Sequence, residues 1–400
     1  MGSVQADEPS TPARDARRDL ALAWTVGFTM WGLLLSVDPL LPAIQNELAL
    51  TFTLRSLVLA LPFLSMAIAA IPGGFLADRS GIRRSVTLGG AIATGGAGLR
   101  AVPGGTVLLL TAAVVFGLGL GLVIPNLPKL VSTRYGRDLG GFATGVYSTG
   151  LIMGSVAGVY LTKPLADVLG SWRWALVIWA ALGVCVVGAW TLWVSPAHPS
   201  LRQSETGFRT LLRRRELWVL AFLFAAGNAS YFFLVGNYPP YLASRGLGLD
   251  AALGQLTLLI AVGVPAIFLA PILSDGLRAR RPFLWGPHVL IAALLLLIGR
   301  LPLVAIPAVS VGLGLAEMAI FALVLLLPVD LFSSDEVGRG SGIVVSFAYV
   351  GALVGPLAAG IAVDLTRSFE GVLEAFALLS ILAAFATFAL PETGAHGRRS

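Results

Sequence analysis

One acidic residue, Glu317, lies near the middle of a long apolar stretch that covers residues 304–327. A charge held inside a membrane costs at least about 2.5–3.5 kcal/mol on insertion scales, so such a residue suggests a function. Ser310 and Gly314 precede it at helical spacing, which predicts a small polar face that lines a cavity. There Glu317 can exchange protons or balance a cationic solute. The alternative is a structural carboxyl paired within the protein.

Neutral side chains at similar depth can supply a binding surface of aromatic faces and a few hydrogen bonds. Trp31 lies near the middle of one apolar stretch, and Asn228 and Tyr231 lie near the middle of another. Tyr147 and Tyr349 occupy similar depths in two further stretches. Any one of them alone is more often a packing residue than a ligand contact. Together with Glu317, they form the predicted substrate-binding set.

A glycine-containing basic segment follows the second apolar stretch and reads Gly74-Phe-Leu-Ala-Asp78-Arg79-Ser-Gly81-Ile-Arg83-Arg84. Glycines allow a sharp turn and close backbone approach. The Asp78 carboxylate can pair with nearby arginines or with the positive N-terminal end of a helix. A partial copy 197 positions later brings Asp275, Arg280 and Arg281. We predict a gate from both segments; the alternative is a solvated turn that only sets topology.

The elements that must position these residues are long apolar stretches. The chain is 56% hydrophobic and 12% charged, whereas soluble domains are about 25% charged. A spanning helix needs about 20 apolar residues, and no alternating strand pattern recurs. We therefore predict an all-α membrane protein with twelve transmembrane helices, over 22–42, 52–74, 84–102, 106–128, 140–163, 172–195, 217–241, 252–274, 283–302, 304–327, 340–363 and 370–390.

A polar stretch from Ser195 to Glu216 divides the chain into two similar halves. The shift of 197 positions also aligns Pro42 with Pro239, while a shared Gly-Leu-Gly-Leu segment aligns Gly117 with Gly312. Two six-helix bundles related by a pseudo-two-fold axis are a known transporter plan. The predicted organisation is a disordered tail (1–18), a first bundle (19–195), a cytoplasmic linker (196–216), a second bundle (217–390) and a cytoplasmic tail (391–400).

The net charge of +6 follows membrane topology rather than a nucleic-acid partner. With both termini cytoplasmic, 20 basic residues fall on the inner side and 7 on the outer side, as the positive-inside rule requires. We expect a multi-pass protein of the inner or plasma membrane. The single cysteine, Cys185, is predicted to be an apolar core residue. Charged residues at predicted helix ends are expected to be interface groups: Asp38, Arg100, Lys129, Arg300 and Asp364.

The Gly74–Arg84 segment resembles the loop motif of the major facilitator superfamily at every fixed position. The resemblance implies a secondary transporter that works by alternating access, with helices one, four, seven and ten around the cavity. It also implies that Asp78 contacts the eleventh helix in the outward-facing state. A single chain suffices for the path, so a monomer is expected, with no cofactor and no metal. The segments Gly-Leu-Arg100-Ala and Pro125-Asn-Leu-Pro128 are more distantly similar to cyanate and nitroimidazole porters.

Absent residue types narrow the function. There are 4 asparagines, too few for a sugar site, so an apolar, aromatic or cationic organic solute is expected, moved with protons. An ATP-driven pump needs a phosphate-binding loop that ends in Lys-Ser/Thr, and Lys129 and Lys163, the two lysines, fit no such loop. The scattered histidines argue against an enzyme. The alternatives are an uncoupled facilitator, a small-anion (cyanate-like) porter and, more remotely, a channel or a transporter-like sensor.

Overall fold

A computed structural model of the chain describes residues 13–196, 208–332 and 334–393. Throughout these residues the regular structure is helical. The twelve long helices are α1 (Ala13–Leu35), α3 (Phe52–Ser80), α4 (Ile82–Leu99), α5 (Gly105–Val123), α6 (Asn126–Leu169), α7 (Trp172–Trp193), α9 (Arg215–Ser244), α10 (Leu249–Gly276), α11 (Pro282–Leu297), α12 (Ile306–Leu331), α13 (Ser334–Thr366) and α14 (Glu370–Thr387). The short elements are η1 (Asp38–Leu40), α2 (Leu41–Leu48), α8 (Phe208–Leu212) and η2 (Leu303–Ala305).

The long helices fit a membrane-spanning fold. In the described part of the chain, 9 helices are long and apolar enough to cross a membrane, and α11 is a shorter apolar helix. With α4 and α6 they make the twelve predicted helices. Large apolar side chains on α7 point away from the protein, including Trp174 and Leu192, which are 60% and 71% exposed. Cys185 is exposed on the same helix, so its assignment to the core is wrong.

Prolines and glycines explain where several helices begin and end. The first helix already starts at Ala13, so the part of the predicted tail after residue 12 is helical, while residues 1–12 lie outside the described residues. Pro39 and Pro42 open the short η1 and α2 after it, since proline fits the first turn of a helix. Gly81, at φ 88°, separates α3 from α4.

The predicted loop after the fourth helix and the fifth predicted helix form one continuous helix, α6, of 44 residues. The predicted linker holds the short α8, and residues 197–207 within it lie outside the described residues. The last predicted segment, 391–400, is described as far as Thr393.

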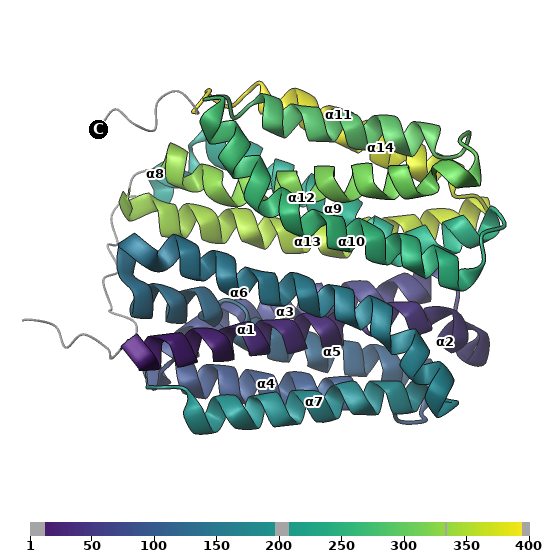
Figure 1. Cartoon of the computed structure of the whole chain (residues 1–400), viewed down its shortest axis with the longest axis horizontal. Coiled ribbons are helices and arrows are strands. Elements are labelled where there is room, and N and C mark those ends of the chain that lie inside the picture. Colours follow the sequence, from purple (N-terminus) through teal and green to yellow (C-terminus); the bar gives the residue numbers. More distant parts are fainter. Residues whose placement is uncertain (1–12, 197–207, 333, 394–400) are drawn as a thin grey trace, which may run out of the picture.

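The helices form two layers that lie side by side (Figure 1). The layer of α1 to α7 is coloured purple to teal, and the layer of α8 to α14 is coloured green to yellow. Helix α1 begins and α14 ends at one end of the molecule, which we call the termini end; the opposite end, with α2, is the far end. The layers meet through α3 with α13 and through α6 with α10.

The internal repeat is visible in how the helices pack. A Cβ atom on Gly154 of α6 would lie 2.0 Å from the carbonyl oxygen of Phe28 on α1. A Cβ atom on Gly351 of α13 would lie 2.0 Å from the carbonyl oxygen of Ala225 on α9. The two glycines are 197 positions apart in sequence, and so are the two residues that they contact. Each half therefore has the same close helix crossing at the same place.

The same comparison corrects one sequence alignment. A Cβ atom on Gly117 of α5 would lie 2.2 Å from the Pro62 carbonyl oxygen, and one on Gly314 of α12 would lie 2.1 Å from the Leu259 carbonyl oxygen. These two contacts are again 197 positions apart. Gly314, rather than Gly312, is therefore the structural equivalent of Gly117. The alignment of the two Gly-Leu-Gly-Leu segments is therefore shifted by two residues from the structural equivalence.

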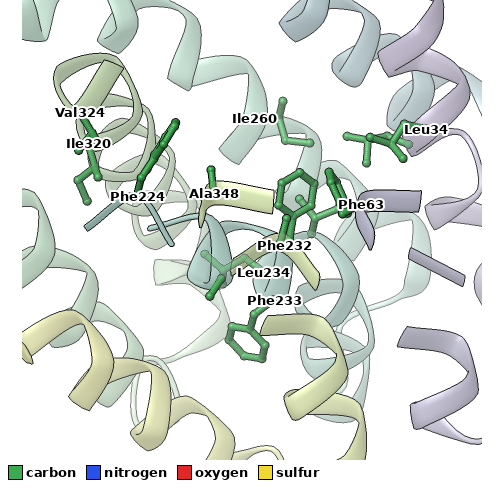
Figure 2. Close-up of a cluster of buried hydrophobic side chains, with 14 of the residues drawn as sticks. Leu34, Phe63, Phe224, Phe232, Phe233, Leu234, Ile260, Ile320, Val324 and Ala348 are labelled. Atoms are coloured by element: carbon green, nitrogen blue, oxygen red, sulfur yellow. The ribbon is translucent and has the colours of Figure 1, made fainter. Parts of the chain in front are cut away.

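Aromatic packing joins the two halves in the core (Figure 2). Phe63 of α3 and Phe232 of α9 lie side by side, with ring centroids 4.3 Å apart. Phe233, on the other side of α9, stacks on Phe376 of α14 at 4.2 Å. Helix α9 is therefore fixed within its own half and also contacts the other half, next to the cavity described below.

Candidate functional site

A cavity of about 100 Å³ lies between the two layers. Helices from both halves contribute to it, so a change in the angle between the halves changes its shape. Its walls are mostly apolar or aromatic, with a few polar groups. The lining residues are Trp31, Ser148, Leu151, Ile152, Ser155, Phe224, Gly227, Asn228, Tyr231, Phe232, Ile260, Glu317, Met318, Ile320 and Phe321.

Glu317 is the carboxyl group in this lining and is only 2% exposed. Its Oε1 atom has no hydrogen-bond partner in the described part of the chain. The Ser230 side chain of α9 is its polar neighbour, and the Ser230 hydroxyl is likewise buried without a hydrogen bond among these residues. Because a buried polar group without a partner is costly, Glu317 Oε1 provides unused hydrogen-bonding capacity at the cavity wall.

The predicted polar face on α12 is only partly correct. Ser310 accepts or donates a 2.9 Å hydrogen bond with the Tyr238 hydroxyl and donates to Gln255 Oε1 at 3.0 Å. Gly314 packs against the backbone of α10. These two residues therefore hold α12 to its own half, and Glu317 is the one of the three that reaches the cavity.

Ring packing sets the shape of the aromatic walls. Phe224 of α9 and Phe321 of α12 have ring centroids 5.6 Å apart. Tyr231 meets Phe232 edge to face at 5.1 Å. Asn228 lies between Phe224 and Tyr231 along α9. Its Nδ2 atom donates to the Phe224 carbonyl oxygen at 3.0 Å. The side-chain amide is thereby held at the wall by its own helix.

Four of the six predicted binding residues line the cavity: Trp31, Asn228, Tyr231 and Glu317. Tyr147 of α6 and Tyr349 of α13 are not in the lining, although they come close enough to interact with each other across the two halves. Along α6, Tyr147 lies on the termini side of the lining residue Leu151. The pair therefore lies between the cavity and the termini end.

Sequence reasoning missed most of the apolar lining. Phe224, Phe232, Met318 and Phe321 stand among many similar residues in apolar helices, and nothing in their spacing marks them. Ser155 also lines the cavity, although in sequence it is one small polar residue among the glycines of its helix.

The prediction that the charged residues at helix ends are solvent-exposed groups at the membrane interface is wrong for Asp38 and Arg100. Asp38 is 1% exposed, and both of its carboxylate oxygens are buried without a hydrogen bond in the described residues. Its charged neighbour is Arg55, also buried. Arg100 is 2% exposed, donates to the Leu33 carbonyl oxygen at 3.1 Å, and lies 4.2 Å above the Phe116 ring. Arg300, in contrast, is exposed.

The loop motif in the first half lies at the termini end. Asp78 forms an ion pair with Lys129 of α6 at 3.2 Å, so Lys129 is also a partner of the motif. Gly74 leaves room for the Lys129 ammonium, which approaches its carbonyl oxygen at 3.5 Å. Arg83 donates to the Thr191 carbonyl oxygen at the end of α7, with Nε at 2.9 Å. Arg79 and Arg84 are exposed.

The second copy of the motif is more heavily paired. Arg280 bonds to Asp275 at 2.7 Å and to Asp330 of α12 at 3.2 Å. Arg281 donates from Nε to the Leu390 carbonyl oxygen, just after α14, at 2.8 Å. Arg83 makes a similar contact in the first half, although the shift of 197 positions aligns Arg83 with Arg280.

Comparisons with known proteins agree with this architecture. The sequence model of the Major Facilitator Superfamily matches residues 20–324. The cyanate transport protein CynX of Escherichia coli (strain K12) is 28% identical over 313 residues, which cover 76% of this chain and 79% of CynX. The uncharacterized transporter YycB of Bacillus subtilis (strain 168) is 26% identical over 360 residues, 86% of each chain.

A solved structure has the same fold. The crystal structure of a bacterial homologue of the human lysosomal transporter Spinster, in an inward-facing and unoccupied conformation, superposes with a TM-score of 0.81. The alignment covers 95% of this chain and 97% of the other at 16% identity. From the family match over most of its length and the shared twelve-helix architecture, the chain belongs to the major facilitator superfamily of membrane transporters.

Proposed function

We propose that the protein is a secondary transporter that moves a small apolar, aromatic or cationic organic solute by alternating access, coupled to protons. The observation that carries this proposal is the cavity between the halves, with aromatic walls and the single buried carboxyl of Glu317 in its lining. Faces of aromatic rings attract organic cations, and a nearby carboxylate adds charge complementarity.

The size of the cavity in this structure means that it must widen to hold an aromatic solute. A volume of about 100 Å³ is smaller than the engineered cavity of roughly 150 Å³ that holds benzene. Since the cavity is built by both halves, it can widen when the halves separate at one end. Glu317 can carry a proton when the solute is absent and lose it when a cation arrives, because an unpaired buried charge is costly. This competition would couple the two fluxes.

For the orientation, we propose that the termini end is cytoplasmic and the membrane is the inner or plasma membrane. The excess of basic residues in the loops of that end supports this placement. We further propose that the two motif segments form the cytoplasmic gate. Asp78 would leave Lys129 and approach the N-terminal end of α13 when the far end opens, since a helix N-terminus attracts a carboxylate.

The test combines ligand binding with transport. Thermal unfolding of the purified protein is measured against organic cations, neutral aromatics, sugars and small anions; a ligand at 100 times its Kd adds about 2.7 kcal/mol of stability. In liposomes, Glu317→Gln should abolish accumulation driven by a pH gradient. The matched control is Glu374→Gln, an exposed carboxyl on α14. Unchanged proton dependence in Glu317→Gln would leave an uncoupled facilitator.

A small-anion porter is the second candidate, because of Arg100 and the similarity to CynX. The Arg100 guanidinium is buried, and its Nε and Nη2 atoms have no hydrogen bond among the described residues. Arg100→Met keeps the apolar bulk and removes the charge. Stabilisation of the protein by cyanate that is lost in Arg100→Met would favour the anion porter over the organic-solute transporter. A channel does not need a switching contact at Asp78, so solute flux that is unchanged in Asp78→Asn would instead favour a channel.

A further inference from the structure

At the far end, the first turn of α3 contacts the last turns of α13. The Asp364 side chain of α13 accepts hydrogen bonds from the backbone N–H of Phe52 at 3.0 Å and of Thr53 at 2.8 Å. It also accepts from the Thr53 hydroxyl at 2.5 Å. The first backbone N–H groups of a helix have no partner within it, so a residue of the second half satisfies two donors that belong to the first half.

The surroundings make this contact close and specific. One turn before Asp364 on α13, a Cβ atom on Gly360 would lie 2.5 Å from Ser56 Oγ and 2.7 Å from the Phe52 carbonyl oxygen. On the other side of the same turn of α3, Arg55 Nη2 donates to the Gly236 carbonyl oxygen of α9 at 3.0 Å. The start of α3 is therefore bound by two helices of the other half.

We propose that Asp364 is the far-end counterpart of Asp78, and that the two carboxylates close opposite ends of the same antiparallel helix pair in turn. Asp78 lies in the last turn of α3, and Asp364 lies in the last turns of α13. Asp364 thus lies beside the N-terminal end of α3, where the helix dipole favours a negative charge. Because the two helices run antiparallel, Asp78 would meet the N-terminal end of α13 in the same way when the termini end closes. In the present structure the Asp364 contact is formed, while Asp78 pairs with Lys129 in its own half.

The internal repeat offers a natural comparison. The residue 197 positions before Asp364 is Asp167, at the end of α6 and near the start of α10. There Lys163 bridges Asp167 at 2.7 Å and Asp250 of α10 at 2.9 Å. Both carboxylates are largely exposed, at 61% and 81%, and exposed ion pairs stabilise little. The Asp364 contact, with two backbone donors and one hydroxyl, is therefore the stronger of these two equivalent contacts.

The experiment measures the opening of each end without any substrate. In a Cys185→Ser background, one pair of spin labels at Asn46 and Arg367 reports the far end, and a second pair at Thr133 and Leu277 reports the termini end. All four sites are exposed. Pulsed electron–electron resonance in lipid nanodiscs then gives both distance distributions for each variant.

Asp364→Asn removes the charge and replaces one accepting oxygen by an amide nitrogen, so the side chain can no longer accept from both Phe52 and Thr53. The open-to-closed ratio at the far end should rise at least tenfold, with matching closure at the termini end, whereas Asp250→Asn should leave both distributions as in the unmodified protein. A far-end distribution in folded Asp364→Asn that equals the unmodified one overturns the proposal. Thr53→Val keeps the carboxylate and should shift the far end in the same direction by less.

Two variants keep the test decisive. If Asp364→Asn does not fold, an unchanged far end in Thr53→Val overturns the proposal. Asp364→Glu keeps the charge and should restore more of the closed population than Asp364→Asn. The inference rests on the proposed alternating-access cycle but not on the role of Glu317, since no solute or pH gradient enters the measurement. Failure of proton coupling and failure of this contact are therefore seen in separate assays.

Discussion

Replacing Gly154 by alanine gives a sharp test of the packing between α1 and α6. The new Cβ atom would lie 2.0 Å from the Phe28 carbonyl oxygen and 2.7 Å from its carbonyl carbon. An ordinary contact of a Cβ atom begins at 3.4 Å, so the two helices must move apart. Overpacking of this kind costs typically about 1–3 kcal/mol. The neighbours are backbone atoms, which cannot rotate away.

The matched control is Gly95→Ala on α4, where nothing lies within 4 Å of the new atom. There the substitution should stabilise by about 0.5–1 kcal/mol, because alanine is a better helix former than glycine. Thermal unfolding of both variants in the same detergent gives the comparison. Gly351→Ala, at the equivalent place in the second half, should behave like Gly154→Ala. Equal unfolding temperatures for Gly154→Ala and Gly95→Ala would refute the close crossing of α1 and α6.

Three further outcomes follow from the contacts described above. Asp78→Asn should keep the fold, as judged by gel filtration, but slow transport in liposomes, and wild-type turnover would refute its role in the gate. Arg281→Gln removes the guanidinium hydrogen bonds to the Leu390 carbonyl oxygen. Each hydrogen bond to a charged group contributes about 1.5–3 kcal/mol, so the free energy of unfolding should fall by at least that amount. Cys185 should react with a membrane-permeant maleimide in folded protein, and its protection would contradict its position on the outer face of α7.

The helix count and the two motif segments could be predicted from sequence, because hydrophobic length and a fixed pattern of glycine, aspartate and arginine are local properties. The place of Glu317 in the cavity lining could also be anticipated, since a lone acid in an apolar helix is too costly to face lipid. Depth along the helix was enough to predict that Trp31, Asn228 and Tyr231 line the same cavity.

What could not be predicted depends on how helices rotate about their own axes. Gly314 and Ser310 share a face with Glu317 by spacing, yet α12 turns that face partly toward α9 and α10. Asp38 and Arg100 lie at the ends of predicted spans, where depth suggests water, but tertiary packing buries both. Cys185 is apolar enough for the core and equally suited to face lipid, which sequence alone does not distinguish.

The recurring distance of 197 residues also allows the chemistry of the two halves to be compared position by position. The position that matches Glu317 in the first half is Leu120 on α5, a fully buried leucine. The position that matches Asp364 is Asp167, whose carboxylate faces solvent and a lysine. The two halves thus differ in their chemistry while they share their glycine crossings. The second half carries Glu317 in the cavity and Asp364, which bonds to the first half. The first half carries the complete motif from Gly74 to Arg84. Neither half alone therefore holds all the groups that the proposed transport cycle uses.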